Sequence, residues 1–316
     1  MRFFQVGTIA LFIASLFDIP KREIKDFKIP ILLLLGLVIV NSFWHRFQPL
    51  DIRAVEDLFF GVLAFVIVTK YLADPKDCIK YILIALGINL MILTLQRIGW
   101  CPTISLPHYI PDDIELEGGM LGNITKFCVY LAIILPFISL PIALVLAFVF
   151  GIYMHYSQIS VLIPVALMMF YRFKNKIHRY LLVCCMSITA IFLYKKIAAS
   201  ILLRWNDIWK LTIDRIFEKP LLGWGLGNYQ LWISKESFCS YLPFIYGLGL
   251  LGAVWVGYAI WWFIKRFDAS KEAIAVAGLL LVSSIEYSFE IPRLWFTIIA
   301  VFSFFAIRII DKKEAT

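Results

Sequence analysis

Charged residues are scarce in this sequence of 316 residues. Asp, Glu, Lys and Arg make up 16% of the chain, whereas hydrophobic residues reach 61%. A typical soluble domain is about 25% charged and about 45–50% apolar. The mean hydropathy is accordingly high, at +0.84. This composition excludes a soluble globule, so we expect residues 1–316 to form a single transmembrane domain.

Several chemical signatures are absent as well. The six cysteines show no metal-ligand spacing, and the acidic stretch 112–117 lacks the EF-hand pattern. The first apolar segment has no small-residue cleavage site, and most nearby basic residues follow it, so we expect a retained helix rather than a signal peptide. The net charge of +8 is typical of the cytoplasmic loops of membrane proteins, so we expect no nucleic-acid partner.

Long apolar runs recur along the whole chain, separated by short charged segments. A helix satisfies its backbone hydrogen bonds internally, as a bilayer requires. A crossing helix needs roughly 20 mostly apolar residues, so the sequence predicts an all-α bundle with about eleven crossings. We place these near residues 3–17, 29–44, 55–73, 78–98, 121–138, 140–154, 157–171, 180–195, 239–264, 272–289 and 293–309.

Basic residues gather on one side of this expected bundle. Segments 18–28, 70–80, 172–179, 265–271 and the tail from Arg308 hold 17 Lys and Arg residues, whereas the short segments on the other side hold six. Because cytoplasmic loops collect Lys and Arg, we expect the C-terminus in the cytoplasm. The N-terminus and the two long loops, 99–120 and 196–238, are then expected outside.

The external loop 196–238 carries the most informative pattern. Apolar residues recur at helical spacing at Trp205, Ile208, Trp209, Thr212, Ile213 and Ile216, which predicts an amphipathic helix on the membrane surface. Pro220 should end it, and the glycines that follow predict a tight turn. Exposed N–H groups in such a turn can hold phosphate oxygens. An interfacial helix followed by a turn without any ligand fits the same spacing.

Three sequence blocks follow one another between residues 118 and 252. The first, GGMLGNITKFCVYLAIILP (118–136), opens on a glycine–asparagine step and ends in proline. The second joins Arg204 to PLLGWGLGNY (220–229), and the third is SYLPFIYGLGLLG (240–252). In this order the blocks resemble the family of O-antigen ligases and related lipid-linked glycan polymerases, and the second block is the most specific.

The resemblance implies a multi-helix bundle with a large external loop over a membrane-embedded site. Family members transfer a glycan from an undecaprenyl diphosphate carrier to an acceptor, with no nucleotide, metal or other cofactor. The implied partners are the carrier-linked glycan, a glycan acceptor and the lipids of the bacterial inner membrane. The acceptor is a lipid, as in lipopolysaccharide, a sugar or a protein. In a polymerase it is another lipid-linked repeat unit.

The transfer implied by the resemblance needs a held diphosphate and an activated acceptor hydroxyl. Arginine suits the diphosphate, and Arg204 matches the family arginine. Arg215 is a candidate through its place in the same loop. The other expected binding residues are Gly223, Gly225, Gly227 and Asn228 of the turn, Gly122 and Asn123 of the first block, and Gln158.

Two positions depart from the family pattern. Phe238 stands where a histidine usually opens the third block, no histidine occurs in 179–316, and Gln158 replaces a usual arginine. Glu286 is then a candidate base because carboxylates at membrane depth are costly and functional by default. His155, at an expected outer helix end, is the other candidate base. The alternative from a different class is a non-catalytic binder or transporter of lipid-linked glycan.

Overall fold

The computed structural model is all-helical over the part of the chain that it describes. The described residues are 3–45, 49–98, 100, 124–153, 158–172, 208–226, 228–229, 239–284 and 295–314. Within them the chain forms α-helices and short 3-10 turns, and no strand. The expected all-α class is therefore confirmed.

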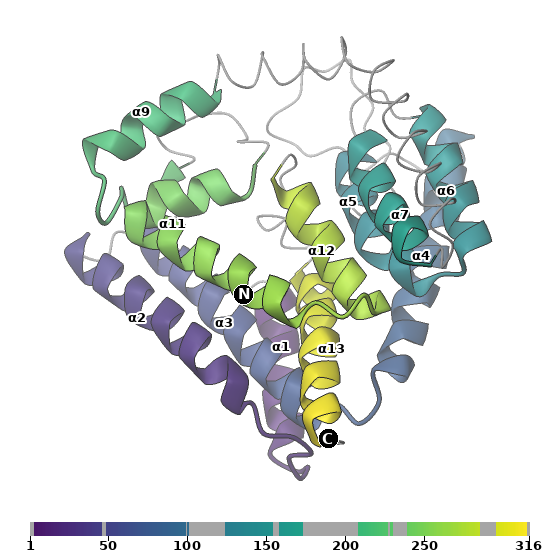
Figure 1. Cartoon of the computed structure of the whole chain (residues 1–316), viewed down its shortest axis with the longest axis horizontal. Helices are drawn as coiled ribbons and strands as arrows, with labels where there is room; N and C mark the ends of the chain where they lie inside the picture. Colours follow the sequence, from purple (N-terminus) through teal and green to yellow (C-terminus); the bar gives the residue numbers. More distant parts are fainter. Residues whose placement is uncertain are drawn as a thin grey trace.

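The helices follow the expected apolar runs (Figure 1). They are α1 (Phe3–Ser15), η1 (Lys25–Phe27), α2 (Lys28–Trp44), α3 (Pro49–Tyr71), α4 (Pro75–Arg97), α5 (Ile124–Ile134), η3 (Leu135–Phe137), α6 (Leu140–Tyr153), α7 (Gln158–Arg172), α9 (Lys210–Glu218), α11 (Tyr241–Arg266), α12 (Lys271–Ser283) and α13 (Trp295–Glu314). Each expected run corresponds to a helix except 180–195, which lies outside the described residues. The largest difference in a start is α3, whose described part begins at Pro49 rather than near residue 55.

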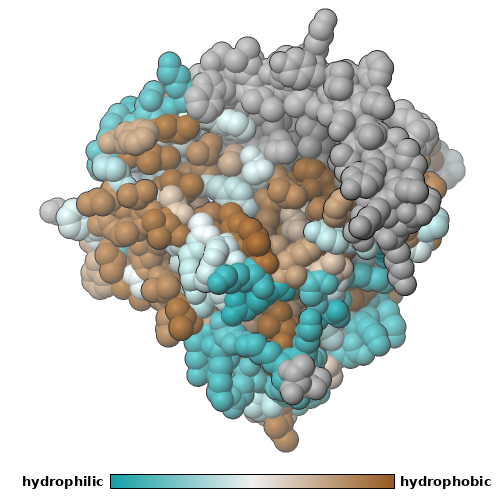
Figure 2. All heavy atoms as spheres, in the orientation of Figure 1, coloured by the Kyte–Doolittle hydropathy of each residue, from teal (hydrophilic) through white to brown (hydrophobic). Residues whose placement is uncertain are grey.

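Among the residues that the structure describes, three helical segments are long and apolar enough to cross a membrane. They are Lys25–Trp44, Pro75–Gln96 and Tyr241–Arg266, and shorter apolar helices span Gln5–Ser15, Phe127–Phe137 and Val161–Arg172. Large apolar side chains are exposed on the long helices, including Leu32 on α2 and Ile84 on α4. Figure 2 shows such hydrophobic surface over much of the molecule. The structure therefore defines three candidate membrane spans, as expected of a membrane protein.

Helix α5 lies at the centre of the largest hydrophobic core. Its residues from Phe127 onward are buried on every side, which is typical of a helix enclosed by others. It packs against α7, α12 and α13. Where α7 meets α12, a Cβ added at Gly278 would lie 3.2 Å from the Pro164 ring. The small glycine therefore lets the proline of α7 approach α12 closely.

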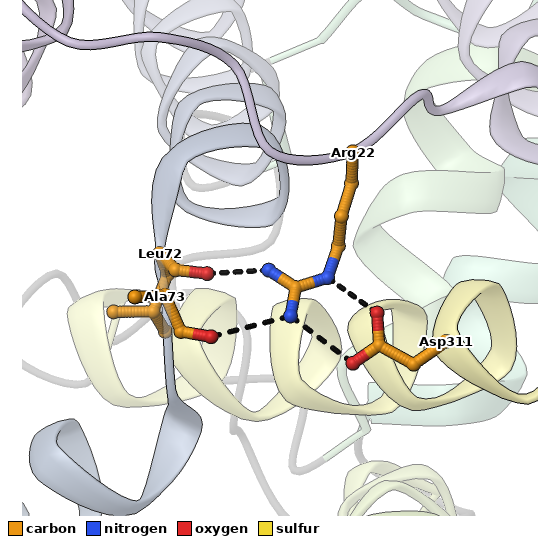
Figure 3. Close-up of polar contacts among 4 residues, drawn as sticks. All are labelled: Arg22, Leu72, Ala73 and Asp311. Carbon is orange, nitrogen blue, oxygen red and sulfur yellow. Dashed lines mark hydrogen bonds and ion pairs between the residues drawn. The ribbon is translucent and has the colours of Figure 1, made fainter.

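Ion pairs gather at one end of the molecule, near the C-terminus. Arg22 forms two hydrogen bonds with Asp311 of α13, at 2.6 and 3.0 Å, and also donates to the carbonyls of Leu72 and Ala73 (Figure 3). Lys313 pairs with Asp26 at 2.6 Å. Hydrophilic surface covers this end in Figure 2. Arg308 also pairs with Asp268. These contacts join segments 18–28, 70–80 and 265–271 to the C-terminal tail, all of which the charge pattern assigned to one side.

Helices α2 and α11 run antiparallel and connect this end to the opposite one. Trp255 Nε1 donates to the Pro30 carbonyl at 3.1 Å, near the start of α2. At the other end of α2, Asn41 contacts Gly247 of α11. Because α2 has 17 residues, its ends lie about 25 Å apart. The glycine-rich second block of the sequence is found at the Asn41 end.

Candidate functional site

The amphipathic helix expected in the 196–238 loop is α9. Its inner face buries Thr212 and the preceding Ile208, whereas Lys210 and Asp214 are exposed. The hydroxyl of Thr212 donates to the Ile208 carbonyl, and it also lies 3.2 Å from the hydroxyl of Tyr229. Helix α9 ends just before Pro220, as the sequence predicted. It packs on the beginning of α11, as Figure 1 shows.

Helix α11 is interrupted at Gly249, which has a left-handed φ of +64°. Such a φ is readily adopted only by glycine. In an unbroken helix, the N–H groups of Leu250 and Leu251 would donate to the carbonyls of Tyr246 and Gly247, four residues earlier. The interruption leaves these two donors and two acceptors available to another part of the chain.

The glycine turn, residues 219–226, supplies the four missing partners. The N–H groups of Leu250 and Leu251 donate to the carbonyls of Pro220 (2.6 Å) and Leu221 (3.5 Å). In return, the N–H groups of Trp224 and Gly225 donate to the carbonyls of Tyr246 (2.9 Å) and Gly247 (3.0 Å). A broken helix at membrane depth is tolerated only when its freed backbone groups are satisfied in this way.

Two glycines make this close approach possible. A Cβ added at Gly249 would lie 2.6 Å from the backbone of Gly223 and of Leu221. A Cβ at Gly223, which has a φ of +66°, would collide with the backbone of Tyr246 and Gly249. The glycines of the second and third sequence blocks therefore meet each other in space.

Helix α2 holds the turn from the other side through Asn41. This side chain is 1% exposed, and its Nδ2 donates to the carbonyls of Leu222 (2.5 Å) and Gly247 (3.0 Å). One amide thus bridges the turn and the end of the first half of α11. The Oδ1 atom of Asn41 is buried with no hydrogen-bond partner, as is the hydroxyl of Tyr246.

Cations and aromatic rings cover the outer side of the turn. Lys219 Nζ lies 3.9 Å from the centroid of the Trp224 ring, and the Arg215 guanidinium lies 5.8 Å from it. The indole of Trp224 donates to the Arg215 carbonyl at 2.7 Å and stacks on Tyr246. Arg215 also pairs with Glu218 at 3.0 Å. Lys219 and Arg215 therefore place two positive charges over one aromatic platform, a site suited to an anion.

The structure corrects the expected role of the turn's backbone. The sequence suggested that N–H groups at the glycines would be exposed and able to hold phosphate. Instead, the N–H groups of Gly223, Trp224 and Gly225 donate to the carbonyls of Lys219, Tyr246 and Gly247. Gly223 and Gly225 thus allow close packing, and their N–H groups are not available to a phosphate.

The structure describes part of the expected site. Arg215, Gly223, Gly225 and Asn228 lie together, and Asn228 Nδ2 donates to the Trp224 carbonyl at 2.9 Å. Gln158 is the first residue of α7, but its side chain lies outside the described residues. The remaining expected residues also lie outside them: Arg204, Glu286, His155, Gly122, Asn123 and Gly227.

Sequence reasoning missed three participants, namely Asn41, His45 and Lys219. His45 directly follows α2, and its pKa responds to the nearby backbone of Leu222 and Gly223. Asn41 was the clearest available signal because it is a polar residue within an apolar run. Its contact with Leu222 joins positions 181 residues apart, so no local spacing could reveal it.

Comparison with known proteins adds no relative. No protein-family model and no curated protein matches this chain. The resemblance to O-antigen ligases therefore rests on the three sequence blocks.

Proposed function

We propose that this chain is a membrane glycosyltransferase of the O-antigen ligase type. It would transfer a glycan from undecaprenyl diphosphate to a lipid, sugar or protein acceptor on the outer face of the bacterial inner membrane. The observation that carries the proposal is the fit of the glycine turn into the gap of α11. This fit gives a physical reason for the glycines of the second and third blocks, which are the residues on which the resemblance depends.

The cations beside the turn support a site for the carrier diphosphate. Lys219 and Arg215 flank Trp224, and we assign Arg204, earlier in the same loop, to the diphosphate with them. Positive charge at this place would stabilise the negative charge that develops on the leaving group. Gly122, Asn123 and Gln158 are proposed to line the groove for the carrier or the acceptor.

The proposed reaction is a single displacement. The acceptor hydroxyl oxygen bonds to the anomeric carbon of the glycan, and the bond from that carbon to the phosphate oxygen breaks. Undecaprenyl diphosphate leaves, and the hydroxyl proton passes to a base, for which Glu286 and His155 are the candidates. The same step with a second carrier-linked repeat as acceptor would make the chain a polymerase.

The proposed placement in the membrane has about eleven crossings, with the N-terminus and the long loops outside and the C-terminus in the cytoplasm. Support comes from the ion pairs that join the basic segments at one end. The glycine turn lies at the opposite end of α2. A cytoplasmic basic end and an external site are consistent with this separation.

Glycan transfer in liposomes tests the proposal. The purified chain would be reconstituted with an undecaprenyl diphosphate glycan and candidate acceptors, and release of the carrier diphosphate would be followed. We expect release coupled to transfer, its abolition by Arg204→Ala, and unchanged rates for Lys210→Ala, an exposed cation of α9. Unaltered transfer by Arg204→Ala would remove this arginine from the mechanism.

A second candidate function is a non-catalytic binder or transporter of the same lipid-linked glycan. The absence of histidine from 179–316 and the glutamine at position 158 favour it. Holding a diphosphate does not require cleaving it. Carrier binding by the wild-type chain without any release would select this function over the transferase.

A further inference from the structure

His45 occupies an unusual position beside the glycine turn. It caps the end of α2, and its backbone N–H donates to the Asn41 carbonyl at 3.0 Å. The backbone of Leu222 and of Gly223 lies close enough to its ring to affect its pKa. The ring atom Nε2 is buried and has no hydrogen-bond partner within the described part of the chain. Since Asn41 also binds Leu222, two neighbouring turns of α2 hold the same short segment.

This environment suits the neutral imidazole. A neutral ring carries a proton on one nitrogen, whereas the imidazolium carries a proton on both. Protonation at Nε2 would create a buried N–H donor without an acceptor, and such a group is costly. The added positive charge would also face Lys219, whose charge acts on the ring. The geometry therefore disfavours the charged form while the turn is docked.

Among the residues that the structure describes, the charged groups around His45 come from few elements. Burial, followed by the charge of Lys219, lowers the pKa of His45, and the nearby backbone of Leu222 and Gly223 opposes this shift. Helix α3 brings Glu56 and Asp57 to this end of the molecule, but neither contributes to the shift. Arg215 and Glu218 of α9 pair with each other. The charged residues of α2 and α11 lie at the ends remote from His45: Lys28, Lys265 and Arg266.

We propose that His45 is a positioning residue that makes docking of the glycine turn depend on protonation. The neutral ring keeps the turn in the gap of α11, and protonation at Nε2 releases it. After release, the four backbone groups of the gap can still find hydrogen-bond partners. Leu250 and Leu251 can then donate to the Tyr246 and Gly247 carbonyls within a continuous helix. The proposal requires no ligand and so goes beyond the proposed function.

The sign of the pH dependence follows from the two states. In the released turn His45 has its ordinary pKa of 6.5, and in the docked turn its pKa is lower. Docking is therefore fully stable above pH 6.5 and weakens as the pH falls below it. Until the docked pKa is reached, each pH unit raises the ratio of released to docked turns by up to about tenfold.

Hydrogen–deuterium exchange of the full-length chain in lipid nanodiscs tests this proposal at pH 7.5 and 5.5. Exchange rates corrected for intrinsic pH effects would be compared for peptides covering residues 219–226 and 246–252. In the wild type we expect protection of the Trp224 and Gly225 amides to fall up to about tenfold per pH unit. In His45→Gln, which cannot take up a proton, protection should be equal at both pH values. No change in the wild type, or an equal change in His45→Gln, would overturn the proposal.

Lys219→Gln provides a second test that does not depend on how well His45→Gln folds. Lys219 is exposed, so its loss should not disturb the core. Removing its charge raises the pKa of docked His45, which reduces the pH response of docking. The response below pH 6.5 should thus be smaller than in the wild type, while Lys210→Gln, at the start of the preceding helix α9, behaves like the wild type. A response in Lys219→Gln as large as the wild type's contradicts the proposed repulsion.

Discussion

At the scale of single residues, the candidate site depends on backbone groups and on the small size of glycine. The backbones of Gly223 and Gly249 lie too close together for either residue to carry a side chain. The glycine spacing in the sequence correctly predicted a tight turn, but the N–H groups of Gly223 and Gly225 are not exposed as the sequence had suggested. The turn's hydrogen-bond partners lie in α11, and sequence spacing gives no information on which distant carbonyls they reach.

Gly249→Ala should expel the turn from α11. A residue with a side chain costs roughly 1–3 kcal/mol in the backbone conformation of Gly249, and the added Cβ would also press on Gly223 and Leu221. We expect the free energy of unfolding to drop by at least about 2 kcal/mol, measured by denaturation in detergent. Gly257→Ala is the matched control, since Gly257 lies in the same helix with nothing within 4 Å of an added Cβ. Equal stability of the two variants would contradict the tight contact.

Asn41→Leu should destabilise the chain because the Leu222 and Gly247 carbonyls each lose a donor. The Gly247 carbonyl keeps the N–H of Gly225 as a donor, so the Leu222 carbonyl is the acceptor left unsatisfied. Leaving such an acceptor unsatisfied costs about 1–3 kcal/mol. Ser42→Ala is the comparison, because Ser42 is equally buried but bonds only to Val38 of its own helix. Thermal unfolding should show a clearly larger loss for Asn41→Leu. A loss no greater than that of Ser42→Ala would show that Asn41 does not hold the turn.

At the scale of elements, apolar runs predicted the helices well. The reason is physical: long apolar runs can satisfy their backbone only as helices in a bilayer, and capping residues such as Asp74 and Ser270 begin α4 and α12. Helix α9 was predicted from its apolar spacing and from Pro220. The break in α11 was not predicted, because Gly249 is one of several glycines in that run and only the docked turn distinguishes it.

Arg22→Gln should loosen the connection between the α1–α2 linker, α3 and α13. The Arg22 side chain is 10% exposed and pairs with Asp311, and hydrogen bonds of charged groups contribute roughly 1.5–3 kcal/mol each. We expect a loss of about 2 kcal/mol in unfolding free energy. Lys25→Gln is the control, since Lys25 and its partner Glu23 are both exposed and such pairs contribute at most about 1 kcal/mol. Similar losses for both variants would contradict a structural role of Arg22.

At the scale of the whole molecule, two chemically different ends are joined by α2 and α11. One end holds the ion pairs of Arg22, Arg308 and Lys313. The other holds the turn, α9 and the cations beside Trp224. Charge counting in the sequence predicted which segments share the basic end, because topology depends on local Lys and Arg content.

Cysteine labelling tests the proposed orientation of these ends. In a background without native cysteines, Asp214→Cys on α9 should react with a membrane-impermeant maleimide on intact inner-membrane spheroplasts. Glu314→Cys at the end of α13 should react only after permeabilisation. Both positions are exposed in the structure, so failure to label cannot be attributed to burial. The reverse pattern would place the glycine turn in the cytoplasm and contradict an external site.

The most direct test of the central claim compares glycan transfer by Gly249→Ala and Gly257→Ala. The claim is that the turn docked in the α11 gap builds the site for the carrier diphosphate. In reconstituted liposomes, the wild type and Gly257→Ala should release undecaprenyl diphosphate at the same rate. Gly249→Ala should be slower by about 100-fold, as is typical when reacting groups are misplaced by about 1 Å. Equal rates for the two variants, at matched amounts of folded protein, would contradict the account.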